Sequence, residues 1–469
     1  MQSFSIENFG CRATEADASA IRAALLASGF APAATHASAD FVVLNSCTVT
    51  AAADSQMRDA VRKIHAANPA ARIVVTGCYA QRAPEEIAAI SGVAWVIGNS
   101  HQSEIPGILR KSLVPETHAP APPTDFVPLS RLARASPPLP RDPARILVGD
   151  IFASTAVPVA PVAPIIPGHT RPIVKIQDGC NNRCSYCVIP FVRGRSRSLP
   201  PDKVIAEVQR LVASGAREIV LSGINLGSYG RDLTPRAALA DVVRRILGET
   251  PLEQLRFSSI EPQDVTEDFA ALVASSRRIA PHFHVPLQSG SDGVLRAMHR
   301  WYRTEHYAER IALVRRLLPH AAIGADIVVG FPGETDADFE ATLEFIARLP
   351  FTYLHVFSFS VRPGTAAANL ARAVPQAAIR ERARALRTLG EQKSAAFRSA
   401  QAGRTLRALT LGRRGGVDRS RDGWTEALTP NYLKVRIAGS HPANEWRDVR
   451  IPADAQALAE LVTATSDLT

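Results

Sequence analysis

The first part of the chain alternates short apolar runs with segments that have helical spacing. Phe41–Asn45 and Arg72–Gly77 are typical of buried parallel strands. Between them, Ala51–Asn68 has the spacing and composition of a helix, which Pro69 ends, and Ala16–Ser28 predicts an earlier helix. The pattern predicts a small α/β domain with a doubly wound parallel sheet over residues 1–112.

The pattern changes between residues 113 and 168, where proline is frequent, as in Ala119–Pro123 and Ser136–Pro140. A segment so rich in proline cannot build a packed core, so we expect a linker here. Within it, Ile146–Val148 and Val157–Ile166 predict short edge strands.

Strand and helix patterns alternate again over residues 169–400. Repeated β–α units predict parallel strands in a partial barrel, with the functional residues at the carboxyl ends of the strands. The six expected strands are Ile173–Ile176, Glu218–Ser222, Leu255–Ser258, Phe283–Leu287, Ile323–Gly330 and Leu354–Ser358. A charged helix is expected at Ile379–Ser399, and residues 401–469 have a strand-like pattern that predicts a small β-barrel.

Composition narrows the possible partners and location. The 469 residues include 46% hydrophobic residues, enough for a large core, but no apolar run of about 18 residues that would cross a membrane. Met1–Glu7 lacks the features of a signal peptide, so we expect a cytoplasmic protein with no membrane partner. The net charge of +10 favours an anionic partner such as nucleic acid, although an arginine-rich composition alone also produces it.

Three cysteines stand close together after the first strand of the second α/β segment. Cys180, Cys184 and Cys187 have the spacing Cys-x3-Cys-x2-Cys. Clustered thiolates are the usual ligands of iron–sulfur clusters, and three of them would leave one iron of a four-iron cluster open to a substrate or cofactor. The alternative is a structural zinc site, which normally has four ligands. No fourth cysteine or histidine lies nearby, because the nearest histidine, His169, is 11 residues before Cys180.

The other three cysteines are far apart in sequence but similarly placed. Cys11, Cys47 and Cys78 each follow a predicted strand of the N-terminal sheet. Loops at the carboxyl ends of parallel strands meet at one edge of a doubly wound sheet, so these cysteines are expected to converge. The alternative is that each is an ordinary buried small side chain.

The motifs around these cysteines, taken in order along the chain, resemble those of one enzyme family. The chain is similar to the radical S-adenosylmethionine methylthiotransferases, and most similar to the subgroup that acts on threonylcarbamoyladenosine beside the tRNA anticodon. The matching segments are Gly10–Cys11, Asn45–Thr50, Thr76–Gln81, Gly179–Cys187, Ile189–Pro190, Arg193–Gly194, Leu221–Asn225, Pro286–Ser291, Asp326–Thr335 and Phe359–Thr365.

The resemblance implies two 4Fe-4S clusters. Cys180, Cys184 and Cys187 would bind the cluster that cleaves S-adenosylmethionine to a radical, and Cys11, Cys47 and Cys78 would bind an auxiliary cluster that carries sulfur. The radical would abstract hydrogen at carbon 2 of the adenine, because that hydrogen is barely acidic and an acid–base mechanism cannot remove it. tRNA, S-adenosylmethionine, an electron donor and a sulfur source are the implied partners.

Further site residues are predicted at or near the ends of barrel strands. They could contact S-adenosylmethionine, or serve only in turns and barrel packing: Ser222, Gly223, Glu261, Gln288 and Asp326. The basic run Arg193, Arg195 and Arg197 could meet a phosphate or a cofactor carboxylate, or form a solvated charged face.

The C-terminal segment resembles a degenerate TRAM-type RNA-binding barrel, with its best match at Thr429–Val435. Its basic residues could contact the tRNA backbone: Arg404, Arg407, Arg413, Arg414 and Lys434. Three other functions stay open: methylthiolation of isopentenyladenosine in tRNA, methylthiolation of an aspartate in a ribosomal protein, and a non-enzymatic RNA-binding module that holds zinc or iron.

Overall fold

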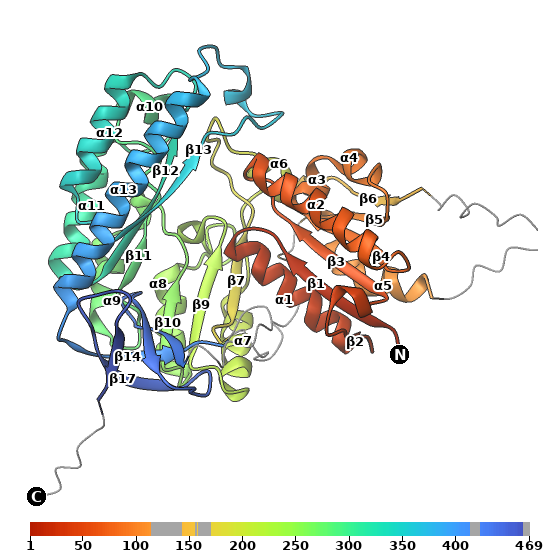
Figure 1. The fold of residues 1–469 in the computed structure, drawn as a ribbon, viewed down its shortest axis with the longest axis horizontal. Helices are drawn as coiled ribbons and strands as arrows, with labels where there is room; N and C mark the ends of the chain where they lie inside the picture. The colour runs from red at the N-terminus through yellow and green to blue at the C-terminus, as the bar shows by residue number, and fades with distance from the viewer. Residues whose placement is uncertain (114–142, 155–156, 158–169, 413–422, 463–469) are drawn as a thin grey trace, which may run out of the picture.

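The computed structural model describes residues 1–113, 143–154, 157, 170–412 and 423–462. An N-terminal α/β part lies beside a central open barrel, and a small β-barrel packs against the central part (Figure 1). The predicted α/β architecture with a C-terminal β-barrel is confirmed. No described helix is both long and apolar enough to cross a membrane.

The N-terminal sheet has six parallel strands in the order β2-β1-β3-β4-β5-β6. They are β1 Ser3–Asn8, β2 Ala31–Pro32, β3 Phe41–Ser46, β4 Arg72–Gly77, β5 Val93–Gly98 and β6 Arg145–Leu147. Apolar clusters pack on both faces, as expected for a doubly wound sheet. The helices are α1 Arg12–Ala27, α2 Ala51–Ala67, α3 Cys78–Arg82, α4 Pro84–Ala88 and α5 Ile105–Lys111.

Strand β6 comes from the segment predicted as a linker. Its residue Arg145 pairs with Trp95 of β5, so the predicted edge strand at residues 146–148 exists and extends the N-terminal sheet. The second predicted edge strand, Val157–Ile166, lies outside the described residues except for Val157. The proline-rich residues 114–142 lie outside them as well.

The central part has six parallel strands at the predicted positions. Strands β10, β9 and β7 form one sheet with β8 at its edge, and β11, β12 and β13 form another. Single bridges, Leu255 to Ile279 and Ser259 to His284, join the two sheets. The strands are β7 Ile173–Asp178, β8 Arg197–Ser198, β9 Glu218–Gly223, β10 Gln254–Phe257, β11 His282–His284, β12 Ala322–Val329 and β13 Tyr353–Ser358.

Helices cover the outer face of this open barrel, where its main core lies. Val174 and Ile176 of β7 belong to that core, so Lys175 and Gln177 face the opposite side. The helices are α6 Ile189–Arg193, α7 Pro201–Ala213, α8 Leu239–Glu249, α9 Glu267–Ser275, α10 Asp292–Ala297, α11 Thr304–Leu317, α12 Asp336–Arg348 and α13 Gln376–Gln401.

The C-terminal strands form the closed barrel β14-β15-β16-β18-β17. They are β14 Thr405–Thr410, β15 Trp424–Leu428, β16 Lys434–Ala438, β17 Trp446–Arg450 and β18 Leu458–Leu461. The buried Arg256 of β10 donates to the carbonyls of Thr429 and Pro430, which attaches this barrel to the central part.

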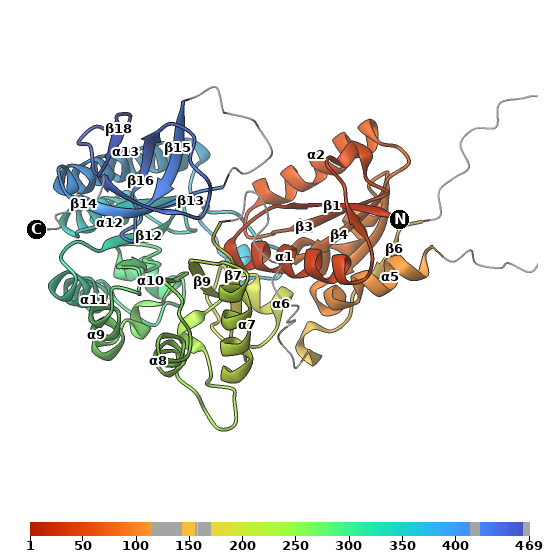
Figure 2. The same ribbon diagram turned by 90° about the horizontal axis from the view of Figure 1, so that it is seen from below.

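Helix α1 connects the N-terminal part to the open side of the central barrel. It lies beside β7 and β9 in both views (Figures 1 and 2). Ala16 of α1 packs on Ile173 of β7 and Val220 of β9. Cys11, which immediately precedes α1, is therefore placed next to the barrel interior.

Candidate functional site

The loop with Cys180, Cys184 and Cys187 joins β7 to α6 and is held by polar contacts. Gln177 donates to the carbonyls of Asp178 and Gly179. Gly179 has φ of +71°, and a Cβ there would collide with the carbonyl of Arg195, so the turn into Cys180 requires glycine. The sequence therefore brings the three predicted thiols onto one braced loop.

The environment of these thiols suits metal ligation. Burial is the main cause that raises the pKa of Cys180 to about 11 and that of Cys187 to about 12. Without a metal both groups are neutral thiols near pH 7, and a bound cluster must displace their protons. Arg300 Nη1 donates to Cys184 Sγ at 3.3 Å, which places a positive charge beside this loop.

The structure also brings Cys11, Cys47 and Cys78 together at the carboxyl edge of the N-terminal sheet. Cys11 precedes α1, Cys47 follows β3, and Cys78 begins α3. Gly10 has φ of +137°, and a Cβ there would run into Cys47, so glycine allows the first two loops to touch. Burial, followed by the charges of Cys11 and Cys78, raises the pKa of Cys47 to about 12.

Neither triplet fits a single zinc ion. Among the described residues, which include all six cysteines, only His284, Asp326 and His355 bring three potential ligand atoms within 4.8 Å of one another. Thiolates on one zinc with bonds of about 2.3 Å would lie roughly 3.8 Å apart. The wider spacing of the cysteines suits a polynuclear iron–sulfur cluster, and their all-thiolate donor sets have the right chemistry for it.

A buried network of charges connects the two cysteine triplets. Arg193 Nε donates to Cys78 Sγ at 3.2 Å, and its other nitrogens bind Asp17 at 2.7 Å and Asp178 at 3.1 Å. Lys175 bridges the same two carboxylates, at 2.7 Å from Asp178. Asp178 also accepts from the backbone N–H of Gly179, the residue before Cys180. A chain of contacts therefore runs from Cys78 through Arg193 and Asp178 to Gly179, the residue before Cys180.

Sequence reasoning missed this network. Arg193 and Arg197 are buried, so the predicted solvated charged face is wrong for both, and only Arg195 is exposed. Gly194, at φ of +74°, makes the turn that places Arg193 and Arg195 on different sides. The sequence does contain one indication of this network, which is charged residues at positions where apolar ones are expected. Asp17 interrupts the apolar face of α1, and Lys175 interrupts a buried strand.

Two of the five predicted cofactor contacts, Glu261 and Gly223, lie beside the loop that carries Cys180, Cys184 and Cys187. Glu261 is ion-paired with Arg300, the residue that donates to Cys184. Gly223 packs against Gln177, which braces the loop. Ser222 precedes Gly223 and is buried.

Asp326 and Gln288 lie on the β12 side of the barrel. Asp326 Oδ1 is 3.0 Å from His284 and 3.3 Å from His355. Burial opposes ionisation of Asp326, but these two histidines outweigh it and lower its pKa. Gln288 bonds the backbone of Asp326 with its own N–H at 2.7 Å. Contact of any of these five residues with S-adenosylmethionine stays a prediction.

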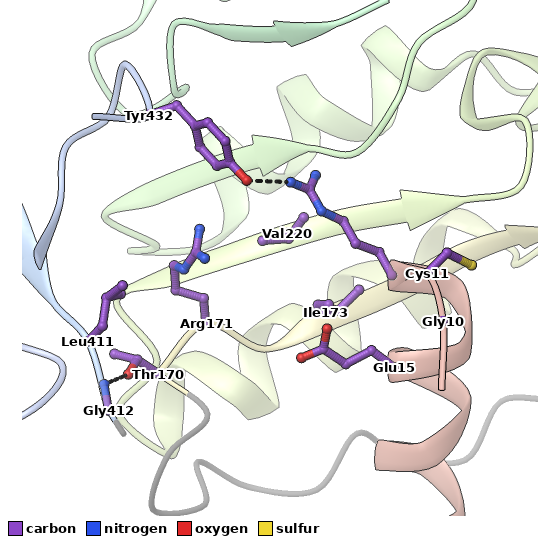
Figure 3. Close-up of a pocket in the computed structure, with 11 residues that line it drawn as sticks. Gly10, Cys11, Glu15, Thr170, Arg171, Ile173, Val220, Leu411, Gly412 and Tyr432 are labelled. Carbon is purple, nitrogen blue, oxygen red and sulfur yellow. Dashed lines mark hydrogen bonds between the residues drawn. The ribbon is translucent and has the colours of Figure 1, made fainter. Parts of the chain in front are cut away.

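Two cavities open beside the cysteines. One of about 430 Å³ is lined by Cys184 and Cys187 together with Phe191 and His299. The other, of about 330 Å³, is lined by Cys11 and by residues of all three parts of the chain (Figure 3).

Some basic residues of the C-terminal barrel already make ion pairs within the molecule. Arg407 pairs with Glu253 at 3.3 Å and lies over the ring of Trp446. Lys434 pairs with Glu426. Arg413 and Arg414 lie outside the described residues. Contact of this barrel with tRNA stays a prediction.

Comparison with known proteins agrees with this geometry. Residues 174–346 match the Radical SAM superfamily model, and residues 3–98 match the Uncharacterized protein family UPF0004 model. The chain is 33% identical over 433 residues, 92% of its length and 96% of the relative's, to a protein of Aquifex aeolicus named threonylcarbamoyladenosine tRNA methylthiotransferase. The chain belongs to the radical S-adenosylmethionine methylthiotransferase family.

Other members of the family are similarly related to the chain. A Bacillus subtilis protein with the same name is 31% identical over 97% of this chain and 98% of its own length. The tRNA-2-methylthio-N(6)-dimethylallyladenosine synthase of Acidothermus cellulolyticus is 34% identical over 89% of this chain and 79% of its own length. Membership in the family implies S-adenosylmethionine and a 4Fe-4S cluster as cofactors.

A solved structure shares the fold. The radical S-adenosylmethionine methyltransferase TsrM from Kitasatospora setae aligns with a TM-score of 0.57 and 16% identity, over 78% of this chain and 77% of its own. At this identity the match supports the arrangement of the chain and says nothing of its substrate.

Proposed function

We propose that this radical S-adenosylmethionine enzyme inserts a methylthio group at carbon 2 of N6-threonylcarbamoyladenosine beside the anticodon of tRNA. The observation that carries the proposal is the pairing of two cysteine triplets, linked through Arg193. Names of relatives that match nearly the full chain support the substrate. The proposed division is an N-terminal domain at 1–112, a linker at 113–168 whose strand β6 adds to the N-terminal sheet, a radical domain at 169–400 and a TRAM-like domain at 401–469.

The two triplets would hold two 4Fe-4S clusters. When bound, the cluster at Cys180, Cys184 and Cys187 would supply the electron that cleaves S-adenosylmethionine. The cluster at Cys11, Cys47 and Cys78 would carry the sulfur. The chemistry consumes electrons and sulfur, so an external electron donor and a sulfur source are further proposed partners.

The chain's own residues position these groups. Arg300 donates to Cys184 and pairs with Glu261, which fixes one thiolate relative to the barrel. Arg193 fixes Cys78 in the same way. Cys47 and Cys78 are buried, whereas Cys11 is exposed and Cys180, Cys184 and Cys187 are half-buried. A cofactor radical needs shielding from water, so the bound substrate would have to complete the cover over the exposed side of the site.

Anaerobic reconstitution tests the two clusters. We expect about eight iron and eight sulfide per chain, because each triplet would hold one four-iron cluster. Cys184→Ala and Cys47→Ala should each lower the count to about four. Colorimetric iron and sulfide assays measure this. A wild-type enzyme with full activity and four iron or fewer would refute the second cluster.

The modified nucleoside tests the substrate. Mass spectrometry of tRNA nucleosides from a strain without this protein should show that 2-methylthio-N6-threonylcarbamoyladenosine is lost and that its unthiolated precursor accumulates. Restoring the gene should reverse both changes, whereas a Cys184→Ala copy should not. Loss of the methylthio derivative of isopentenyladenosine instead would assign the other tRNA substrate. Unchanged tRNA together with loss of a methylthio-aspartate would move the substrate to a ribosomal protein.

A further inference from the structure

The cavity beside Cys11 lies where the three parts of the chain meet. Cys11 and Arg12 lie at the start of helix α1, Arg171 at the start of the central barrel, and Tyr432 in the C-terminal barrel. Figure 3 shows Tyr432 on one side and Cys11 on the other, with Arg171 below Val220. With a volume of about 330 Å³, the cavity has room for a small organic group.

Positive charge is in excess among the described residues around this cavity. Arg171 and the neighbouring Arg256 both pair with one carboxylate, the fully buried Glu218, at 3.3 and 2.6 Å. Arg12 is half-buried and bonds only neutral oxygens: its Nη2 donates to the Tyr432 hydroxyl at 3.2 Å, and its Nη1 to the Phe257 carbonyl at 3.4 Å. No ion pair between described residues includes Arg12.

The other acidic group of the cavity, Glu15, lines it from α1 and has an interaction of its own. Among the described residues, three guanidinium groups therefore lie near two carboxylates. The positive charge of these arginines also changes the ionisation of Tyr432. Although burial opposes ionisation of Tyr432, Arg12, Arg171 and Arg256 together lower its pKa. A partly buried guanidinium without a carboxylate partner is costly unless an anion joins it.

The proposed substrate carries such an anion at a suitable place. The N6 side chain of threonylcarbamoyladenosine ends in a carboxylate a few bonds from the purine ring. Carbon 2 and the carbon that bears N6 both flank ring nitrogen 1, so the side chain leaves the ring near the reacting carbon. If carbon 2 approaches the sulfur site at Cys11, the carboxylate must be received close to Cys11, where Arg12 follows in sequence.

We propose that Arg12, oriented by Tyr432 and assisted by the charge of Arg171, binds the threonyl carboxylate of the substrate and selects it over adenosines with apolar N6 groups. The inference rests on the proposed function. A guanidinium binds a carboxylate through two parallel hydrogen bonds, which gives direction as well as charge. An apolar N6 group would leave Arg12 unpaired in the closed site, and that is the basis of discrimination.

The test compares two anticodon stem-loop RNAs, one with the free threonyl acid and one with its methyl ester. The reconstituted wild-type enzyme should favour the acid by about 30-fold in kcat/KM, because a partly buried charge pair is lost with the ester. Arg12→Gln should abolish the preference. Arg62→Gln, which removes the same charge from an exposed position on α2, should keep it. Anisotropy of the labelled RNAs on the holoenzyme should show the same pattern in Kd.

Two further variants separate charge from geometry and from folding. Arg12→Lys should keep part of the preference, because it retains the charge but loses the planar fork. Tyr432→Phe should weaken the preference several-fold, because Arg12 loses the oxygen that orients it. Iron content near the wild-type value in both variants shows that the enzyme is folded and loaded.

The outcomes distinguish this inference from the proposed function. If the wild type thiolates the acid RNA and Arg12→Gln weakens activity on acid and ester equally, Arg12 contacts a phosphate or only supports the fold, and the carboxylate assignment is overturned while the substrate stands. If the wild type thiolates neither RNA, both the substrate and the assignment are overturned.

Discussion

Cys184→Ala should abolish formation of 5′-deoxyadenosine from S-adenosylmethionine. Cys184 is one of three thiols on the loop after β7, and with two ligands left the cluster that reduces the cofactor has no stable site. Without a radical, hydrogen cannot leave carbon 2, so thiolation of tRNA should fall to background. Chromatography of the small-molecule products and nucleoside analysis of the tRNA measure the two effects separately.

Cys47→Ala is the matched variant and should differ from Cys184→Ala in cofactor cleavage but not in thiolation. It removes a ligand of the other triplet, so 5′-deoxyadenosine should still form while thiolation stops. Cys47 is a better choice than Cys78, because Cys78 accepts a hydrogen bond from Arg193, which also pairs with Asp178 at the start of the loop that carries Cys180. If both variants still thiolated tRNA, or if Cys47→Ala also lost cofactor cleavage at full iron occupancy of the first site, the division of labour would be wrong.

The parts of this site that could be predicted are those encoded over short distances. Cys180, Cys184 and Cys187 lie on one loop, and six apolar runs gave the barrel strands. The convergence of Cys11, Cys47 and Cys78 could also be expected, since parallel strands place their carboxyl ends at one edge.

What could not be predicted depends on pairing between distant segments. Asp17 meets Lys175 and Arg193 only because α1 docks on β7, and no local pattern encodes that contact. Asp326 meets His284 and His355 because three strands are in register. Basic residues spaced two apart in a glycine-containing loop are normally solvated, so the burial of Arg193 among Cys78, Asp17 and Asp178 had no local signal in the loop.

Asp17→Asn should destabilise the chain more than any surface change. Asp17 and Asp178 balance Lys175 and Arg193 in a site where all four side chains are at most 5% exposed. Removing one carboxylate leaves an uncompensated buried cation, which costs about 3 to 5 kcal/mol. Thermal unfolding of the iron-free chain followed by circular dichroism should show a Tm lower by several degrees. In that state burial raises the pKa of Cys78, so the thiol is neutral and supplies no compensating charge.

Two comparisons make the cause specific. Asp59→Asn removes a carboxylate from the exposed pair with Arg62 and should change stability by less than about 0.5 kcal/mol. Adding Lys175→Met to Asp17→Asn leaves one buried cation, Arg193, facing one buried anion, Asp178. Because that pair is balanced, the double variant should recover much of the lost Tm, although it lacks two of the network's charges. A double variant less stable than Asp17→Asn alone would mean that the individual hydrogen bonds, rather than the charge balance, hold α1 against the barrel.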